Sequence, residues 1–397
     1  MGMTQYKTPG VYREDVFPPP EIGLLTGVPA FIGYATQGPV DAEQQPTPQV
    51  LTLSPQFTQY FGVPQTNSYL SDVVRGFFAN GGGLCYVLRL RENVDALPAL
   101  NQALERLESL ESIDLVCAPD IMRPLQAGAP PVASDAQQMQ LALLNHCERL
   151  GNRIALLDAL PNLTTGEIVT QRQGLRSGGL SGINSALYYP WVWIPDANAD
   201  VGRKKIPPCG HIAGVYARSD QRIGVHKAPA NEVLAEVLDV EVTLSDAQQG
   251  DLNPENINCI RSFPGRGIRI WGARTLSTDP AWTYVNVRRL FITAGRWIER
   301  TLAGVAFEPN DFLLWVRIER ELRAYFGQLF RQGALKGGTE EDAFYVQCDA
   351  ETNPPEVQDA GIVVTEIGLA PAIPSEFVVV RLIHGASGVT ITGPSPA

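Results

Sequence analysis

Three glycine-rich stretches are the first places where this sequence could hold a phosphate group. A phosphate-binding loop needs a lysine followed by serine or threonine directly after its second glycine. Neither Gly81–Gly83 nor residues 333–339 have a lysine in that place, so both stretches are interpreted as turns. The third stretch, Gly265–Gly267 followed by Gly272, misses the glycine spacing of dinucleotide sites and precedes a strand-like segment instead of opening a helix. The sequence therefore predicts no cofactor site.

Nucleophiles and metal ligands lack partners at a useful spacing. Ser181, in Gly179-Leu180-Ser181-Gly182, does not have the glycine placement of a nucleophile elbow. The six cysteines contain no Cys-x-x-Cys pair, which predicts reduced, mostly buried thiols and neither a disulfide scaffold nor a zinc site. No histidine has a second histidine or a cysteine three or four residues away, as a helical metal site would need. The four histidines are His146, His211, His226 and His384.

Three carboxylates follow strand-like segments, where α/β enzymes commonly carry their active sites. They are Asp120, Asp158 and Asp196, and none has a matching base or nucleophile in the sequence. We therefore expect no catalytic residues, no metal and no enzyme. An α/β enzyme stays open as an alternative, because the strand pattern is one that enzymes also use.

Length and charge narrow the class of partner. The chain has 397 residues, enough for two or three domains, and a formal net charge of -11. An acidic surface argues against nucleic acid and anionic membranes, which favours protein partners. No apolar stretch approaches the about 20 residues that span a bilayer, and residues 1–7 do not read as a signal peptide. We expect synthesis in the bacterial cytoplasm and no direct membrane insertion.

The elements that would position any site predict an α/β fold. Apolar runs alternate with amphipathic segments between residues 85 and 196, which is typical of parallel β-α-β units. Continuous apolar strands are expected at 85–90, 113–118, 154–157 and 186–194. Helices are expected near 97–107, from a cap at Ser134 or Asp135 to about residue 150, and more weakly at 166–176.

The second half predicts two long helices. Apolar residues recur at helical spacing from Val287 to Thr301 and again from Trp315 to Leu329. The prolines and glycines of the two ends predict extended arms with short strands. The expected division is an N-terminal arm at 1–30, an α/β domain at 31–205, a second domain at 206–375 and a C-terminal strand and arm at 376–397.

Several segments of this chain resemble the phage tail sheath family. In the second half these include GHIAGVYARSD at 210–220, LNPENINCIRSFPGRGIRIWGARTL at 252–276 and IPSEFVVVR at 373–381. Near the start, PGVY at 9–12, VPAFIGYATQGP at 28–39 and FFANGGGLCYVLR at 77–89 follow the same family in order and content. The resemblance covers nearly the whole chain except its variable middle.

The resemblance implies a structural subunit that polymerises as stacked hexameric rings around an inner tube and contracts to drive the tube through a target envelope. It implies an α/β sheath domain at 206–375 and terminal arms that add strands to neighbouring subunits. It also implies baseplate and terminal cap proteins as partners, and it allows sister sheath proteins. The particle would be a phage tail or an extracellular or cell-anchored contractile particle. A tube or baseplate protein stays open as an alternative. The residues expected in the exchanged strands are Gly10, Val11, Tyr12, Arg13, Val16, Phe377, Val378, Val379, Val380 and Arg381.

One helix face is a candidate surface for the inner tube. On a helix from about residue 311 to 331, the face opposite the apolar stripe bears Arg317, Arg320, Glu321, Gln328 and Arg331. This face is net positive although the chain is acidic, which would suit an acidic tube. We expect Arg317, Arg320 and Arg331 to face the tube, and a solvated helix face is the alternative.

Overall fold

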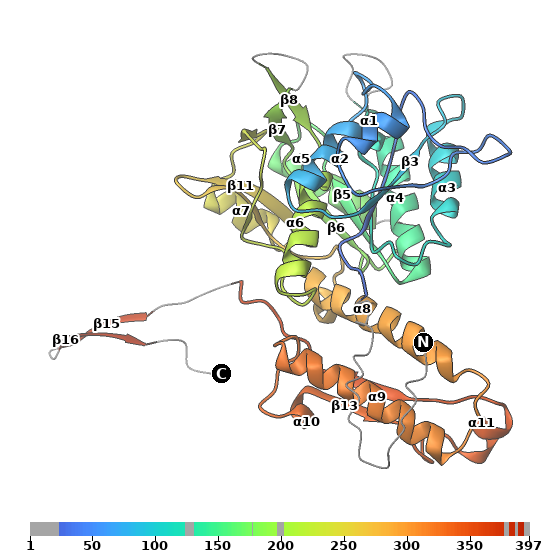
Figure 1. Ribbon diagram of the computed structural model, residues 1–397. Coiled ribbons are helices and arrows are strands. Elements are labelled where there is room, and N and C mark those ends of the chain that lie inside the picture. The colour runs from blue at the N-terminus through green and yellow to red at the C-terminus, as the bar shows by residue number, and fades with distance from the viewer. Residues whose placement is uncertain are drawn as a thin grey trace, which may run out of the picture.

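The largest layer of the protein is a nine-stranded mixed sheet (Figure 1). The computed structural model describes residues 24–123, 131–176, 178–196, 202–376, 381–385 and 388–392. The strand order of the sheet is β2-β3-β1-β4-β5-β6-β11-β12-β9. Its strands are β1 (Pro29–Gly33), β2 (Gln49–Leu51), β3 (Cys85–Arg89), β4 (Leu115–Cys117), β5 (Ile154–Asp158), β6 (Ser185–Tyr189), β9 (Glu232–Val233), β11 (Ile257–Phe263) and β12 (Gly267–Trp271).

The centre of this sheet is parallel, as expected from the β-α-β pattern. β1 pairs in parallel with β3 and β4, and the ladder continues in parallel through β5 and β6 to β11. The edges are antiparallel: β2 pairs with β3, β12 pairs with β11, and β9 pairs with β12. The fold is therefore mixed α/β: the strands expected between residues 85 and 196 lie in the parallel centre, and the antiparallel edge strands β2, β9 and β12 come from outside that range.

Helices cover both faces of the sheet and give it two apolar cores. Alternate residues of one strand point to opposite faces, so Phe31 packs into one core and Ala30 and Ile32 into the other. α1, α2 and α6 cover the first face, and α3, α4 and α5 cover the second. The bounds are α1 (Gln56–Phe61), α2 (Leu70–Ala79), α3 (Ala96–Arg106), α4 (Ala133–Leu150), α5 (Thr165–Arg176) and α6 (Cys209–Arg222), with a short 3-10 turn, η1 (Pro119–Met122), after β4.

Two local expectations were wrong. The run 186–194 is two strands in different sheets, because Pro190 cannot donate a ladder hydrogen bond and Trp191 is buried between them with its Nε1 donating to the Ala159 carbonyl. Its second part, β7 (Val192–Pro195), pairs with β8 (Arg203–Ile206) and β10 (Asp239–Val240). The helix at 133–150 has no side-chain cap, so Ser134 and Asp135 lie inside its first turn.

The main sheet continues past residue 205, where the first domain was expected to end. β11 and β12 belong to it, and α6 packs against α2 on the same face. α7 (Asp246–Leu252) packs against β11. Residues on both sides of position 205 thus share one core.

The C-terminal unit is built on the two predicted long helices, α8 (Val285–Leu302) and α9 (Phe312–Arg331). Figure 1 shows α8 between the sheet and α9. Leu290 and Ala294 of α8 pack into a third core with Trp315, Ile318 and Leu322 of α9, and Val285 and Ile292 join a core of the main sheet. The remaining elements are α10 (Glu340–Ala343), α11 (Pro355–Asp359), β13 (Phe344–Gln347), β14 (Glu366–Leu369), η2 (Pro280–Trp282) and η3 (Ala303–Val305).

The expected arms fall largely outside the described residues. Gly10, Val11, Tyr12, Arg13, Val16, Phe377, Val378, Val379 and Val380 all lie there. Arg381 begins β15 (Arg381–Gly385), which pairs with β16 (Gly388–Thr392) in an antiparallel hairpin. Figure 1 shows this hairpin apart from the body of the protein.

Candidate functional site

The glycine stretches that were tested for phosphate binding are turns. Gly81 and Gly82 lie between α2 and β3, and a Cβ on Gly82 would lie 2.3 Å from the Phe77 ring. Gly265 lies in the turn of the β11–β12 hairpin, and Gly333 lies in the turn after α9. Their backbones serve tight turns and close packing, and none carries the arrangement of a phosphate loop.

Ser181 and the two buried histidines, His146 and His211, are in structural positions. The Ser181 hydroxyl donates to Glu148 Oε1 at 3.0 Å, and a carboxylate in an exposed loop does not make a serine nucleophilic by itself. Burial lowers the pKa of His146 and of His211 to about 4, so both imidazoles are neutral at pH 7. Within the residues that the structure describes, no cluster of His, Cys, Asp and Glu is suited to a metal ion, and no helix is long and apolar enough to span a bilayer.

The carboxylates at the strand ends tie elements together. Asp120 accepts hydrogen bonds from the backbone N–H of Tyr34 and of Tyr69, each at 2.6 Å, and from the Ser68 hydroxyl at 2.7 Å. Asp158 accepts from the Cys209 N–H at 3.0 Å, at the first residue of α6. Burial raises the pKa of Asp158 to about 7. These groups connect strand ends to helix starts, which is a structural role.

A buried ion-pair cluster anchors the base of the N-terminal arm. Asp114 accepts hydrogen bonds from the N–H of Gly27 at 2.9 Å and of Val28 at 2.6 Å. The Arg289 guanidinium lies 2.8 Å from Asp114 and 2.5 Å from Asp220. Burial alone would lower the pKa of Arg289, but the Asp220 and Asp114 carboxylates together raise it above its usual range. Gly27 has a φ of +69°, and a Cβ there would lie 2.5 Å from the Ala217 Cα, so only glycine fits.

The base of the C-terminal arm is anchored close to the Arg289 cluster. Glu376 forms a two-point ion pair with Arg274. Asn286 Nδ2 donates to the Ala372 carbonyl at 3.3 Å, and Ala372 N–H donates to the Ala334 carbonyl at 3.0 Å. Asn286 and Arg289 are both in the first turns of α8. One short stretch of α8 therefore holds the roots of both arms.

The two-stranded β13–β14 sheet offers edges for further strands. Among the described strands, β13 and β14 pair only with each other, so each has one unpaired edge. α9 packs against β13, and Arg323 Nη2 donates to the Val346 carbonyl at 3.1 Å. An unpaired edge can accept an added strand through main-chain hydrogen bonds.

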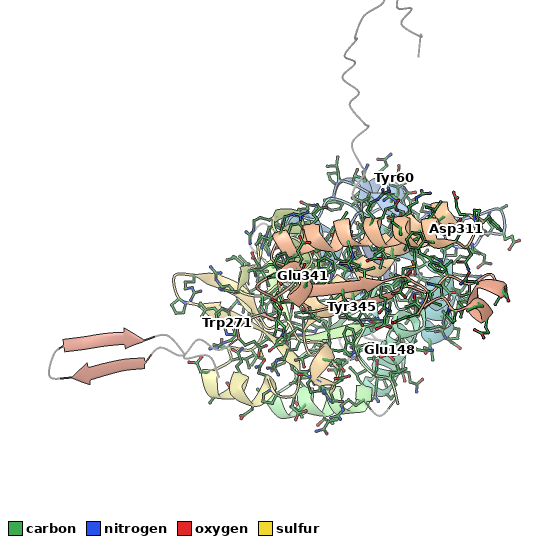
Figure 2. All side chains as sticks on the ribbon, turned by 90° about the horizontal axis from the view of Figure 1, so that it is seen from below. Tyr60, Glu148, Trp271, Asp311, Glu341 and Tyr345 are labelled. Carbon is green, nitrogen blue, oxygen red and sulfur yellow. The ribbon has the colours of Figure 1, made fainter. Side chains whose placement is uncertain are left out.

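The arginines expected to face a tube are exposed, but they are not equivalent. Arg317 Nε lies 3.2 Å from Glu321 Oε1, and Arg331 Nη1 lies 3.2 Å from Glu340 Oε1. Arg320 is exposed and has no ion-pair partner within the described part of the chain. Figure 2, seen from below, shows α9 on the near face with Asp311 at its start and Tyr345 on the neighbouring strand. The unpaired positive charge of this face is therefore concentrated at Arg320.

Sequence reasoning missed the apolar side chains at the start of this helix. Phe312 is 68% exposed and Leu313 is 74% exposed, and Phe307 and Val316 are also exposed. The sequence could have revealed them, because these residues are apolar but lie outside the apolar stripe formed by Trp315, Ile318 and Leu322. The outer face of α9 is thus apolar at its start and charged further along.

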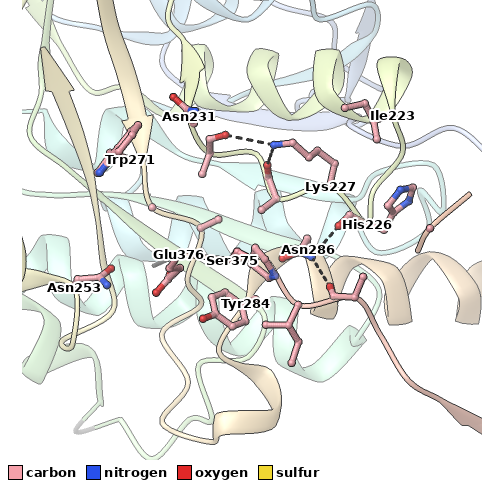
Figure 3. Close-up of a pocket in the computed structure, with 18 of the residues that line it drawn as sticks. Ile223, His226, Lys227, Asn231, Asn253, Trp271, Tyr284, Asn286, Ser375 and Glu376 are labelled. Carbon is pink, nitrogen blue, oxygen red and sulfur yellow. Dashed lines mark hydrogen bonds between the residues drawn. The ribbon is translucent and has the colours of Figure 1, made fainter. Parts of the chain in front are cut away.

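A cavity of about 700 Å³ lies at the root of the C-terminal arm (Figure 3). Its lining includes Trp271 from β12, Tyr284 before α8 and Lys227 from the loop after α6. Ile373 and Glu376, from the last residues before the arm, close another side. No sequence pattern indicated this cavity, because its walls come from six separate segments.

Together the fold and these sites are those of a structural protein: an α/β body that holds Gly27, Val28 and Glu376 firmly and has exposed strand edges. The phage tail sheath protein central domain matches residues 98–276, and the phage tail sheath C-terminal domain matches residues 277–383. The tail sheath protein of Salmonella phage ViI is 28% identical over 275 residues, covering 66% of this chain and 42% of that protein. The chain spans about half or less of the length of the curated relatives that it matches.

Solved structures are also similar to this chain over nearly their whole length. A chain in the baseplate of the anti-feeding prophage is 30% identical, with a TM-score of 0.76, covering 96% of this chain and 99% of that one. A chain in the contracted sheath complex of PVC, an extracellular contractile injection system, is 28% identical with a TM-score of 0.73, covering 97% and 99%. This chain belongs to the phage tail sheath protein family. The family is structural, which agrees with the expectation that the chain is not an enzyme.

Proposed function

We propose that this chain is the subunit of a contractile sheath that polymerises as stacked hexameric rings around an inner tube and shortens to drive the tube through a target envelope. The observation that carries the proposal is the likeness, over 97% of this chain, to a sheath chain in a contracted state. An anchored root for each arm supports it, because a polymer joined by its arms transmits force through those roots.

Strand exchange is the proposed means of polymerisation. Residues Gly10 to Val16 of one copy and Phe377 to Arg381 of another would add strands to a neighbour, and the unpaired edges of β13 and β14 are suitable acceptors. The β15–β16 hairpin would open for this purpose, because a lone two-stranded hairpin is marginally stable in water. A net of about 0.5–1.5 kcal/mol per hydrogen bond makes each exchange weak, and repetition along the polymer makes it durable.

The outer face of α9 is the proposed tube surface. Arg317, Arg320 and Arg331 were assigned to it for their charge, and the ion pairs of Arg317 and Arg331 make Arg320 the main free charge. Exposed ion pairs contribute about 0–1 kcal/mol each, which suits a sheath that must slide from its tube. The exposed Phe312 and Leu313 add apolar contact area.

The remaining partners are proposed from the same family membership. They are an inner tube protein, baseplate and terminal cap proteins, and sister sheath proteins where several share a particle. The chain would assemble in the bacterial cytoplasm and then form part of a phage tail or of an extracellular or cell-anchored contractile particle. The net charge of -11 supports protein partners and not nucleic acid.

Electron microscopy tests this proposal against its nearest alternative. A baseplate role is favoured by the likeness to a chain in a baseplate structure. Micrographs of the chain produced with its tube protein should show wide tubules in two lengths, one with the tube inside and one shorter and empty. Discrete discs, or narrow tubes of a single width, would contradict a sheath and favour the baseplate or tube role.

A further inference from the structure

The cavity at the root of the C-terminal arm has a rigid aromatic wall. The Trp271 ring packs against Phe263 with a centroid distance of 4.6 Å, and Arg274 lies 6.0 Å from the centre of the Tyr284 ring. Arg274 is itself held by Glu376. Figure 3 shows Trp271 and Tyr284 on opposite sides of the space, with Glu376 and Ser375 between them. Side chains fixed in this way bind a ligand with little loss of conformational entropy.

The cavity also leaves large apolar side chains uncovered. Ile373 is 56% exposed and Ile223 is 45% exposed, and both line the space. Lys227 lies beside them and donates to the carbonyls of Ala228 and Ala230. Asn231, which lines the cavity, accepts on its carbonyl from Arg269 Nη1 at 2.8 Å and on its side-chain oxygen from Arg266 Nη2 at 3.4 Å, so both cations lie just outside the lining. The site is apolar and aromatic inside with a positively charged edge.

One segment of the chain matches this chemistry. Residues 14–21 read Glu-Asp-Val-Phe-Pro-Pro-Pro-Glu, which places Phe17 and three prolines between acidic residues. Consecutive prolines favour the polyproline II conformation, which needs no partner for backbone N–H groups and docks in aromatic-lined grooves. Glu14, Asp15 and Glu21 complement the cations at the edge of the cavity. Strand exchange through Gly10 to Val16 leaves this proline segment without a role.

We propose that the cavity binds the segment Phe17–Pro20 of a second copy of this chain. The inference rests on the proposed strand exchange. If Gly10 to Val16 pair on a neighbour, the residues that follow them directly lie on that same neighbour. In that neighbour, Glu376 at the root of the C-terminal arm is also part of the cavity wall. The segment would then fix the register of the exchanged strand, which hydrogen bonds alone specify weakly.

A labelled peptide of residues 14–23 tests the site on the full-length chain, kept dilute enough to remain unassembled. Fluorescence anisotropy should show saturable binding, and a peptide with alanine at positions 18, 19 and 20 should bind at least about tenfold more weakly. W271A should weaken binding by a similar factor. W193A is the matched control, because Trp193 is also half-buried but lies on β7 beside Arg203. I373A removes an exposed side chain at little risk to folding and should also weaken binding.

The possible results distinguish failure of the proline site from failure of the proposed strand exchange. No binding by the wild-type chain, or equal binding by W271A and W193A, would overturn the inference. Binding that emerges only after residues 1–20 are deleted would show that the chain's own segment fills the cavity, which also overturns it. In full-length protein, P18A/P19A/P20A should reduce the yield of tubules several-fold. Normal tubules from that variant would refute the proline site and leave strand exchange intact, whereas tubules from a chain without residues 1–20 would refute exchange itself.

Discussion

Among single residues, Arg289 is a buried cation held between two buried carboxylates. Removing the guanidinium would leave Asp114 and Asp220 buried without a counter-charge, and breaking a buried pair in this way costs about 3–5 kcal/mol. We predict that R289M lowers the free energy of unfolding by about that amount in urea denaturation followed by tryptophan fluorescence. R300M, at an exposed arginine of the same helix, is the control and should change it by less than about 0.5 kcal/mol.

The triple variant R289M/D114N/D220N distinguishes charge from packing. It removes the uncompensated carboxylates, so it should recover a substantial part of the stability that R289M loses. If the triple variant were no more stable than R289M, the stability would derive from the shape of the arginine side chain and not from its charge.

The buried Asp158 predicts a pH dependence of stability. Its pKa is raised from the ordinary 3.8 to about 7, so the folded protein binds a proton that the unfolded chain has released between about pH 4 and pH 7. Stability contributed by this neutral carboxyl is present below pH 4 and falls as the pH rises to 7. D158N should therefore be more stable than wild type by about 2–4 kcal/mol at pH 8, and this advantage should vanish near pH 4.

Comparing D158N with wild type at each pH isolates the effect of Asp158 from that of buried histidines, whose effect on stability has the opposite pH dependence. Burial lowers the pKa of His146 and His211 to about 4, so their contribution is lost as the pH falls from about 6.5 to 4. Both histidines are present in both proteins, and their effect cancels in the difference. A difference that does not change with pH would show that Asp158 titrates in the folded protein as it does in the unfolded chain.

The sequence predicted the helices and strands whose hydrophobic pattern is set by neighbouring residues. β3, β4 and β5 are continuous apolar runs of the length of one strand, and α8 and α9 have a clear apolar stripe. The run 186–194 misled, because residues in two sheets and the buried Trp191 between them are all apolar. Nor could local pattern show that β11 pairs with β6, since that pairing depends on where α6 and α7 pack.

The outer face of α9 leads to a prediction at this scale. Arg320 carries the unpaired positive charge of the outer face of α9, whereas Arg317 already forms an ion pair with Glu321. We predict that R320E leaves the subunit folded but gives empty or prematurely contracted sheaths, because the contact with an acidic tube is reversed. The fraction of extended, tube-filled particles in micrographs measures this.

A control on another helix guards against a general effect of charge. R176E makes the same change at an exposed arginine at the end of α5. It should leave the fraction of extended particles unchanged. Extended, tube-filled particles at normal yield from R320E would refute the assignment of this face to the tube.

At the scale of the whole molecule, the candidate sites arise from contacts between distant parts of the chain. Asp114 and Arg289 are 175 residues apart, and Arg274 and Glu376 are 102 apart. No spacing rule connects such pairs, so sequence reasoning could assign the arms but not the residues that hold them. The same reasoning identified Arg331 by charge and could not foresee its ion pair, because Glu340 lies beyond the end of the helix. The pair of Arg317 with Glu321 could have been foreseen from its i,i+4 spacing.

We expect that the N-terminal arm can be deleted without unfolding the rest of the chain. Its root is fixed at Gly27 and Val28 by Asp114, and deleting residues 1–20 leaves these hydrogen bonds in place. The deletion does remove the proposed exchanged strand, which contributes a few kcal/mol per subunit at about 0.5–1.5 kcal/mol per hydrogen bond. We predict folded monomers with an unchanged thermal midpoint by circular dichroism and no tubules by electron microscopy. Deleting only residues 1–8 keeps Gly10 to Val16 and should still allow tubules, and normal tubules from the longer deletion would show that the arm is not what joins the subunits.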